Sequence, residues 1–236
     1  MSEVRPRLKG QRLKAYENLT SNERRILVVG DIHLPFEKEG YLQHCVDTYE
    51  RFNCNQTVFI GDIVDNNFSS YWPNDPNGMA AGDELSLAID KLKPWTKAFP
   101  VADVTIGNHD RLIARKAFSG LIPKQWIKSY NEVLGTNWNW TDRVVYDDVQ
   151  YIHGEGPSAR KRAKDDMMST VQGHRHTECY VEHFTGNGKT IFAAQTGVGI
   201  DRESYAMAYA KHHKRPALSC LVVIGGHTAI NVIYAV

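Results

Sequence analysis

Apolar runs and polar stretches alternate along the chain, with a different rhythm in its two halves. In the first half, short apolar runs that predict β-strands are followed by longer amphipathic stretches that predict helices. The predicted strands are 25–30, 57–61 and 101–107, and the predicted helices are 39–53, 82–98, 110–117 and 123–134. This alternation is typical of a parallel or mixed sheet covered by helices.

The second half predicts short strands that return on themselves. Two strands meet at Asp147-Asp148, and a hairpin over 178–197 has Asn187-Gly188 at its tip, a pair that favours a two-residue turn. A helix at 158–169, a strand at 169–173 and a second hairpin over 218–236 complete the pattern. The sequence therefore predicts an α/β domain built on two sheets.

We expect a single domain over residues 26–236, preceded by a basic N-terminal extension over residues 1–25. The extension has five basic residues and few apolar ones before residue 15, with a short helix predicted at about 9–19. A basic arm can contact phosphates, but a run of charges is more often a solvated tail.

Composition excludes several classes of protein. An apolar fraction of 42% and a charged fraction of 23% are ordinary for a soluble protein, and a net charge of +1 gives no general reason to expect nucleic acid. The chain has neither an apolar stretch long enough for a membrane helix nor a signal-peptide core. Its four scattered cysteines argue against a zinc-thiolate site and predict mostly buried, reduced thiols. We expect a cytoplasmic protein with no membrane partner.

Candidate chemistry gathers at the strand ends. Each of the first three predicted strands ends in glycine and then in residues that can bind a metal, in the runs DIH, DIVD and NHD. Ligands of open α/β sheets bind outside the carboxyl ends of the strands. Because residues two apart share one face of a strand, Asp31 and His33 are expected to point the same way.

Two later segments add imidazoles, with His153 in YIHG and His174 and His176 in VQGHRH. Each candidate alone has a plainer interpretation. An aspartate after a strand is usually a helix N-cap, which is the better interpretation for Asp110, and a single histidine is usually a hydrogen-bonded core residue. Only the whole ordered set favours a metal site.

The series D-x-H, G-D-x-x-D, G-N-H-D, H-G and G-H-x-H over residues 31–176 resembles the calcineurin-like metallophosphoesterases. That superfamily includes protein phosphatases, cyclic-nucleotide phosphodiesterases and double-strand-break repair nucleases. Residues 196–216 are similar to the tail of small stand-alone members found in bacterial and phage genomes. The resemblance implies a four-layer α/β/β/α sandwich with two mixed sheets and a metal site at the carboxyl ends of the strands.

The resemblance also implies two divalent cations. The ligands of the first would be Asp31, His33 and His176, those of the second Asn108, His153 and His174, and Asp62 would bridge both. This oxygen and nitrogen donor set without thiolates fits Mn²⁺, Fe, Zn²⁺ or Ni²⁺, and we expect manganese to support activity in vitro.

In the mechanism that the resemblance implies, a hydroxide bridging the cations attacks phosphorus directly. His109 would protonate the leaving oxygen, and Asp65 would hydrogen-bond to His109 and keep it oriented. Weaker candidates for substrate contact are Asn66, Arg111 and Arg175. A helical arginine such as Arg111 is more often exposed or ion-paired, and Arg175 would point away from His174 and His176 in an extended segment.

Two departures argue against a dedicated phosphoprotein phosphatase. Asn66 stands where such enzymes have an arginine, and GNHD replaces GNHE. The first hypothesis is therefore a phosphatase or phosphodiesterase acting on small or nucleotide-type phosphoesters, with no oligomeric state predicted.

The alternative is a nuclease acting on DNA or RNA. The basic arm and residues 159–164 could follow a phosphate backbone, with Tyr71, Trp72 and Trp126 as stacking surfaces. Near-neutral charge counts against strong duplex binding, and core or rim packing is the commoner role of such aromatics. A catalytically silent scaffold comes last, because no expected ligand or acid is missing.

Overall fold

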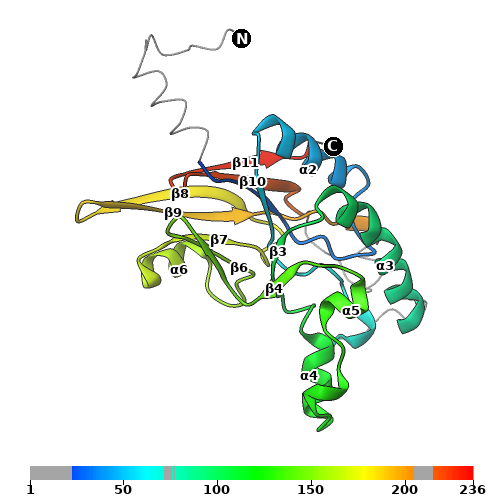
Figure 1. Ribbon diagram of the computed structural model, residues 1–236. Coiled ribbons are helices and arrows are strands. Elements are labelled where there is room, and N and C mark those ends of the chain that lie inside the picture. Colours follow the sequence, from blue (N-terminus) through cyan, green and yellow to red (C-terminus); the bar gives the residue numbers. More distant parts are fainter. Residues whose placement is uncertain (1–22, 72–75, 77, 205–214, 236) are drawn as a thin grey trace.

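The computed structural model describes residues 23–71, 76, 78–204 and 215–235, which form two mixed sheets with helices on both sides (Figure 1). The first sheet has the order β11-β10-β1-β2-β3-β4, in which β1 to β4 run parallel and β10 pairs antiparallel with β1. Its strands are β1 (Arg25–Val29), β2 (Gln56–Phe59), β3 (Asp103–Thr105), β4 (Asn139–Thr141), β10 (Ser219–Ile224) and β11 (Thr228–Ile233).

The second sheet has the order β5-β6-β7-β9-β8, with β6, β7 and β9 parallel and an antiparallel strand at each edge. Its strands are β5 (Val144–Tyr146), β6 (Val149–Ile152), β7 (Ser169–Gln172), β8 (Cys179–Gly186) and β9 (Lys189–Thr196). The helices are α2 (Tyr41–Arg51), α3 (Ala81–Ala98), α4 (Leu112–Ser119), α5 (Tyr130–Leu134) and α6 (Ala159–Asp166), with short 3₁₀ turns η1 (Asn67–Ser69) and η2 (Lys124–Trp126).

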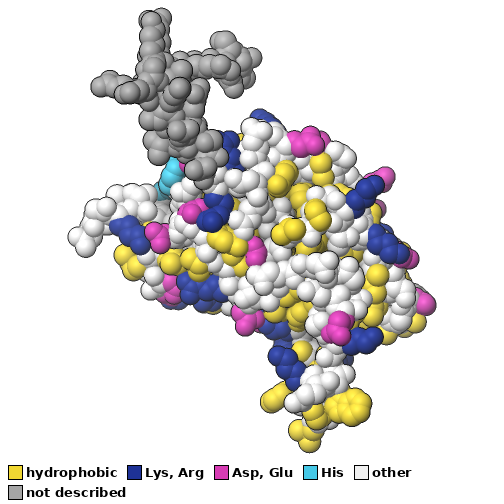
Figure 2. All heavy atoms as spheres, viewed as in Figure 1, with side chains coloured by type: hydrophobic (Ala, Val, Ile, Leu, Met, Phe, Trp, Pro, Cys, Tyr) yellow, Lys and Arg dark blue, Asp and Glu magenta, His cyan; other side chains and the backbone are white. Residues whose placement is uncertain are grey.

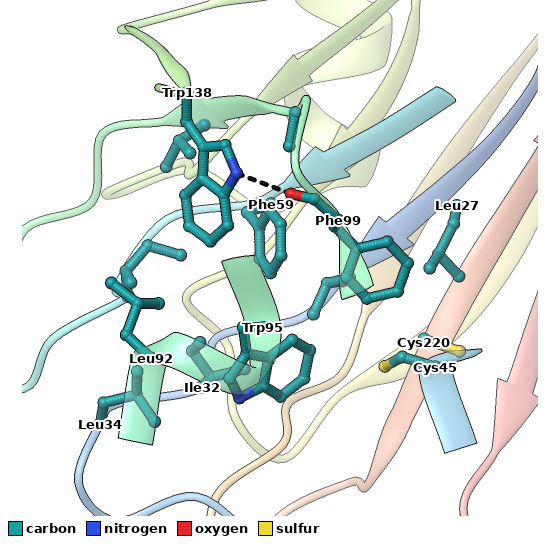
Figure 3. Packing of buried hydrophobic residues seen from close by; sticks show 14 of the residues in the cluster. Leu27, Ile32, Leu34, Cys45, Phe59, Leu92, Trp95, Phe99, Trp138 and Cys220 are labelled. Atoms are coloured by element: carbon teal, nitrogen blue, oxygen red, sulfur yellow. Dashed lines mark hydrogen bonds between the residues drawn. The ribbon is translucent and has the colours of Figure 1, made fainter. Parts of the chain in front are cut away.

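The layers follow from the alternation of side chains along the strands. On one face of β1, Leu27 and Val29 pack in a core with Tyr41 of α2 and Trp95 of α3. Figure 3 shows part of this core, where the indole of Trp138 donates a hydrogen bond to the Phe99 carbonyl at 2.8 Å.

The opposite face of β1 belongs to a second core between the two sheets. There Ile26 and Val28 pack with residues of the second sheet such as Tyr151 and Phe192. On the far side of that sheet, small residues of α6 pack against β9. The successive layers are therefore helix, sheet, sheet and helix, and the predicted four-layer α/β/β/α sandwich with two mixed sheets is confirmed.

Two predicted elements differ from the observed ones, and one observed strand was not predicted. The helix expected over 123–134 is split into η2 and α5, because Ser129 and Glu132 form a capping box that starts a new helix. The third strand is limited to Asp103–Thr105, and β4, which the sequence did not predict, extends the sheet beside it.

The predicted extension over residues 1–25 and its helix at 9–19 fall almost entirely outside the described residues, so the division of the chain stays a prediction. Within the described part of the chain, no helix combines the length and the apolar character that crossing a membrane requires.

Candidate metal centre

The first side-chain cluster lies where β1 and β2 end and where the loop after β7 passes them. One ligand atom from each of its four members lies within 4.8 Å of the others, and the members are Asp31, His33, Asp62 and His176. Nε2 of His33 is 3.1 Å from Nε2 of His176 and 3.6 Å from Oδ2 of Asp62. These are the four residues predicted for the first cation, the bridging aspartate included.

The second cluster shares Asp62 with the first and adds His153 and His174. Nε2 of His153 lies 3.2 Å from Asp62 Oδ2 and 2.9 Å from Asn108 Oδ1, so the predicted amide ligand is also present. The Asp62 carboxylate thus stands between two groups of imidazoles, where its oxygens could bind two cations.

The donor geometry of the centre suits cations. His153 Nδ1 donates to the Ile60 carbonyl at 2.9 Å, so Nε2 is the ring nitrogen that faces the Asp62 and Asn108 oxygens. His33 is oriented in the same manner, because its Nδ1 lies 2.7 Å from Asp65 Oδ1. Lone pairs that converge in this way repel one another unless positive charge lies between them, and partners behind ligating imidazoles are typical of metal sites.

Asp31 gives a separate test of the fit. Its side chain is fully buried, and Oδ2 accepts a hydrogen bond from the backbone amide of His174 at 2.8 Å. Among the residues that the structure describes, none offers a hydrogen bond to Oδ1. Leaving a buried carboxylate oxygen unpaired is costly, and a cation in the first cluster would remove that cost.

The pKa values of the histidines also indicate that the centre favours a positive charge. Burial lowers the pKa of His33 and of His174, which favours the neutral imidazole that metals bind. Burial would lower the pKa of His153 too, but the Asp62 and Asp31 carboxylates outweigh it and raise that pKa to about 9. The carboxylates therefore favour a proton on His153, and a metal cation could replace that proton.

A third cluster joins Asp65, His33 and His109. Asp65 Oδ1 lies 2.7 Å from His33 Nδ1 and 3.3 Å from His109 Nδ1, while His109 Nδ1 donates to the Asp65 carbonyl at 2.6 Å. The structure thus brings Asp65 and His109 together, and it adds a contact that was not predicted, since the Asp65 carboxylate is closer to His33.

His109 is held in place and kept charged. Its backbone amide donates to Asp62 Oδ1 at 2.8 Å, which fixes the segment against the bridging carboxylate. Burial would lower the pKa of His109, but the Asp62 and Asp65 carboxylates raise it to about 10. The ring therefore carries a proton at neutral pH.

Left-handed backbone shapes these loops. His33, Asp62, Asn66 and His174 have φ of 46°, 49°, 51° and 69°, a region that residues other than glycine rarely adopt. Asp31 and His33 both reach the first cluster, as expected, but not through a shared strand face, because His33 has already left the strand conformation. Strained backbone of this kind clusters at functional sites.

Gly107 allows the closest approach in the centre. A Cβ on this residue would lie 2.1 Å from Asp62 Oδ1, so only glycine lets the segment carrying Asn108 and His109 pass this near.

Asp110 has a role that the sequence analysis missed. We expected a helix cap, but α4 begins without a side-chain cap from Asp110. Its buried carboxylate instead accepts hydrogen bonds from the backbone amides of Asp62, Ile63 and Gly107 at 2.9, 3.0 and 2.9 Å. The available signal in the sequence was an aspartate directly after G-N-H. In the structure Asp110 fixes the loop that presents the bridging carboxylate.

The candidate substrate residues near the centre are engaged by the protein. Asn66 Nδ2 donates to the His109 carbonyl at 3.0 Å. The Arg111 guanidinium forms ion pairs with Asp142 and Glu155 at 2.8 and 2.7 Å, the arrangement expected of a helical arginine. Substrate contact by these residues stays a prediction.

Arg175 does not follow the predicted alternation, because its segment turns at His174 instead of extending. Its guanidinium pairs with Glu178 at 3.0 Å and donates to the Gly156 carbonyl at 3.1 Å. Contact between Arg175 and a substrate likewise stays a prediction.

The structure shows the surroundings of the basic segment and of the aromatic residues that were cited for a nuclease. Arg160 pairs with Glu182 at 2.8 Å and Lys161 with Asp165 at 2.7 Å, so part of the charge in 159–164 is balanced. Tyr71 and Trp126 are 57% and 83% exposed, so neither is a core residue. Trp72 lies outside the described residues.

Comparisons with solved structures find similar chains at low identity. An archaeal phosphodiesterase is 13% identical with a TM-score of 0.47, covering 89% of this chain and 99% of that one. A nuclease from Pseudomonas putida is 13% identical with a TM-score of 0.43, covering 88% of this chain and 87% of that one. Vacuolar protein sorting 29 from Cryptosporidium parvum is 13% identical with a TM-score of 0.41, covering 90% and 98%. Likenesses this weak transfer neither activity nor partner.

The family comparison is decisive where the structural likenesses are not. No curated protein sequence matches the chain. The family model described as calcineurin-like phosphoesterase matches residues 24–231, which include every residue of the three clusters. The chain therefore belongs to the calcineurin-like phosphoesterase family.

Proposed function

We propose that this protein is a metal-dependent phosphatase or phosphodiesterase that hydrolyses small or nucleotide-type phosphoesters with two bound cations. The observation that carries the proposal is the place of Asp62, whose Oδ2 lies 3.6 Å from His33 Nε2 and 3.2 Å from His153 Nε2. One buried carboxylate shared by two groups of imidazoles is the arrangement that a two-metal hydrolase needs.

Each cation has its own set of ligands besides the shared Asp62. Asp31, His33 and His176 would hold one, and Asn108, His153 and His174 would hold the other. When bound, the cations supply an activated water as nucleophile and neutralise charge on the phosphate oxygens. The oxygen and nitrogen donors fit Mn²⁺, Fe, Zn²⁺ or Ni²⁺, and Mn²⁺ is the metal that we propose for activity in vitro.

His109 is the proton donor of the proposed reaction. Its Nδ1 donates to the Asp65 carbonyl at 2.6 Å, so a proton given to a substrate would come from Nε2. In hydrolysis the bond from phosphorus to the leaving oxygen breaks as water's oxygen bonds to phosphorus, and His109 protonates the leaving oxygen. Asp65 keeps the ring oriented and charged.

A nuclease is the second candidate, because the exposed ring of Tyr71 offers a stacking surface for a base. The ion pairs of Arg160 and Lys161 and the net charge of +1 count against it. A silent scaffold with the same fold is the third.

Three substrates with Mn²⁺ separate these candidates: p-nitrophenyl phosphate, bis-p-nitrophenyl phosphate and single-stranded DNA. We expect turnover of a nitrophenyl ester that disappears in Asp62→Ala, a change that removes the shared ligand. Degradation of DNA in preference to both esters would favour the nuclease. Inactivity of metal-loaded protein on all three substrates would contradict the proposal and favour the scaffold.

A further inference from the structure

A hollow of about 330 Å³ lies beside α4, outside the three clusters described above. It is lined by Tyr71, Arg111, Ala114, Arg115, Phe118 and Ser119. α4 projects from the body of the molecule (Figure 1), and hydrophobic side chains gather on this projecting tip together with basic ones (Figure 2). A surface with exposed rings and cations in one place favours a planar, negatively charged ligand.

Both walls of the hollow continue from segments that hold His109. On one side, the Arg111 amide donates to the Gly107 carbonyl at 3.1 Å, so α4 starts directly after the turn that carries His109. On the other side, Tyr71 follows η1, and Asn66 at the start of η1 donates to the His109 carbonyl at 3.0 Å. The hollow is therefore built from two segments that also position His109, the proposed proton donor.

The chemistry of the lining is that of a stacking site. Tyr71 and Phe118 are 57% and 82% exposed, so part of each ring surface is open to a ligand. The Arg115 guanidinium lies 5.3 Å and the Lys116 ammonium 5.5 Å from the Tyr71 ring centre. Within the described residues, neither Arg115 nor Lys116 is ion-paired with an acidic side chain.

We propose that this hollow binds the leaving nucleoside of a nucleotide phosphodiester, with its base against Tyr71 and Phe118. Arg115 and Lys116 would face the next phosphate when the leaving nucleoside carries one. The inference rests on the proposed function, because it assigns the leaving-group side of the same hydrolysis. A dinucleotide and the end of a longer strand both present a nucleoside as the leaving group.

A protein partner covering the whole tip would be a different occupant. Leu121 and Trp126 are 90% and 83% exposed on the same projection but do not line the hollow. Trp126 therefore gives a matched control, because its loss should weaken a protein contact over the tip and leave the stacking of a base in the hollow unchanged.

The test compares two diesters of thymidine 3′-phosphate with the Mn²⁺-loaded full chain. In thymidylyl-(3′,5′)-thymidine the second alcohol is a nucleoside, and in the methyl ester it is methanol. Phe118→Leu and Tyr71→Leu should raise KM for the dinucleotide about ten-fold and change KM for the methyl ester less than two-fold, while Trp126→Leu changes neither. A decathymidylate with lower KM than the dinucleotide would indicate that Arg115 and Lys116 bind a further phosphate.

Two results overturn the inference while leaving the proposed function intact: equal effects of the ring variants on both esters, or an effect of Trp126→Leu as large as that of Phe118→Leu. Because the changed side chains are exposed, unchanged unfolding temperatures would show that the fold is not the cause. If wild-type protein with Mn²⁺ hydrolyses neither ester and also leaves bis-p-nitrophenyl phosphate intact, the proposed function itself fails.

Discussion

Asp110 Oδ2 accepts a hydrogen bond from the backbone amide of Asp62 at 2.9 Å, although the two residues are far apart in sequence. The same carboxylate accepts from Ile63 and Gly107, and it is only 3% exposed. It therefore fixes the turn that presents the shared ligand to both clusters. Asp110 is a positioning residue, because its carboxylate is used by backbone amides and faces no substrate.

Asp110→Asn should weaken metal binding. The amide nitrogen would face at least one backbone N–H where the carboxylate now accepts, so the loop carrying Asp62 must shift. Changes of residues behind metal ligands typically cost 10- to 100-fold in affinity, and we expect a loss of that order in a Mn²⁺ titration. Asp142→Asn is the control, since Asp142 is exposed and pairs with Arg111. Unchanged Mn²⁺ affinity in Asp110→Asn would refute the positioning role.

His109→Ala should separate turnover from metal binding. The ring supplies the proton for the leaving oxygen and is not among the predicted metal ligands. We expect kcat to fall by about 10²- to 10⁴-fold while metal content stays that of the wild type. Steady-state kinetics with bis-p-nitrophenyl phosphate and elemental analysis of the same preparation test this, and a fully active variant would remove His109 from the mechanism.

Asp65→Asn should affect both properties. Its Oδ1 lies 2.7 Å from His33 Nδ1 and 3.3 Å from His109 Nδ1, so the variant loses an orienting charge behind a metal ligand and behind the acid. We expect lower Mn²⁺ affinity together with lower kcat, in contrast to His109→Ala. If metal affinity were unaltered, the shorter contact with His33 would have no role in metal binding.

Glu84 should make stability depend on pH. This buried carboxyl in the first turn of α3 accepts from the Asn67 amide at 2.8 Å, and burial raises its pKa to about 7 from an ordinary 4.5. The folded state binds the proton more tightly, so the stabilisation is complete below about pH 4.5 and is lost as pH rises through 7.

The neutral variant Glu84→Gln should not lose this contribution. Its unfolding temperature minus that of the wild type should therefore increase between pH 5 and pH 8. Glu39→Gln serves as the control with an exposed carboxylate. A difference that stays flat or decreases over this range would show that the Glu84 carboxyl is not held protonated by the fold.

Much of the fold follows from local pattern. Short apolar runs placed β1 and β2, and the Asn187-Gly188 turn placed the β8–β9 hairpin, because each signal lies within a few residues. β4 was missed because Asn139–Thr141 is a short, polar edge strand whose partner β3 is distant in sequence. Its pairing is a tertiary effect that no local window contains.

The candidate centre was predictable in membership but not in geometry. Residues following successive parallel strands must meet at one sheet edge, which brings Asp31, Asp62 and Asn108 together. The left-handed backbone of His33 and His174 could not be predicted, since a histidine in the sequence does not indicate that conformation. Backbone geometry that the sequence does not reveal also explains two wrong expectations. The segment of Arg175 turns instead of extending, and the partners of Asp110 are backbone amides, which have no sequence signal.

The central claim is that one carboxylate, Asp62, serves two cations. Elemental analysis by inductively coupled plasma mass spectrometry, after loading with Mn²⁺ and removal of unbound metal, tests it most directly. The account predicts about two metal ions per wild-type chain and almost none in Asp62→Ala, with Asn108→Ala retaining about one. A wild-type chain that binds no metal, or an Asp62→Ala variant that keeps both ions, would contradict it.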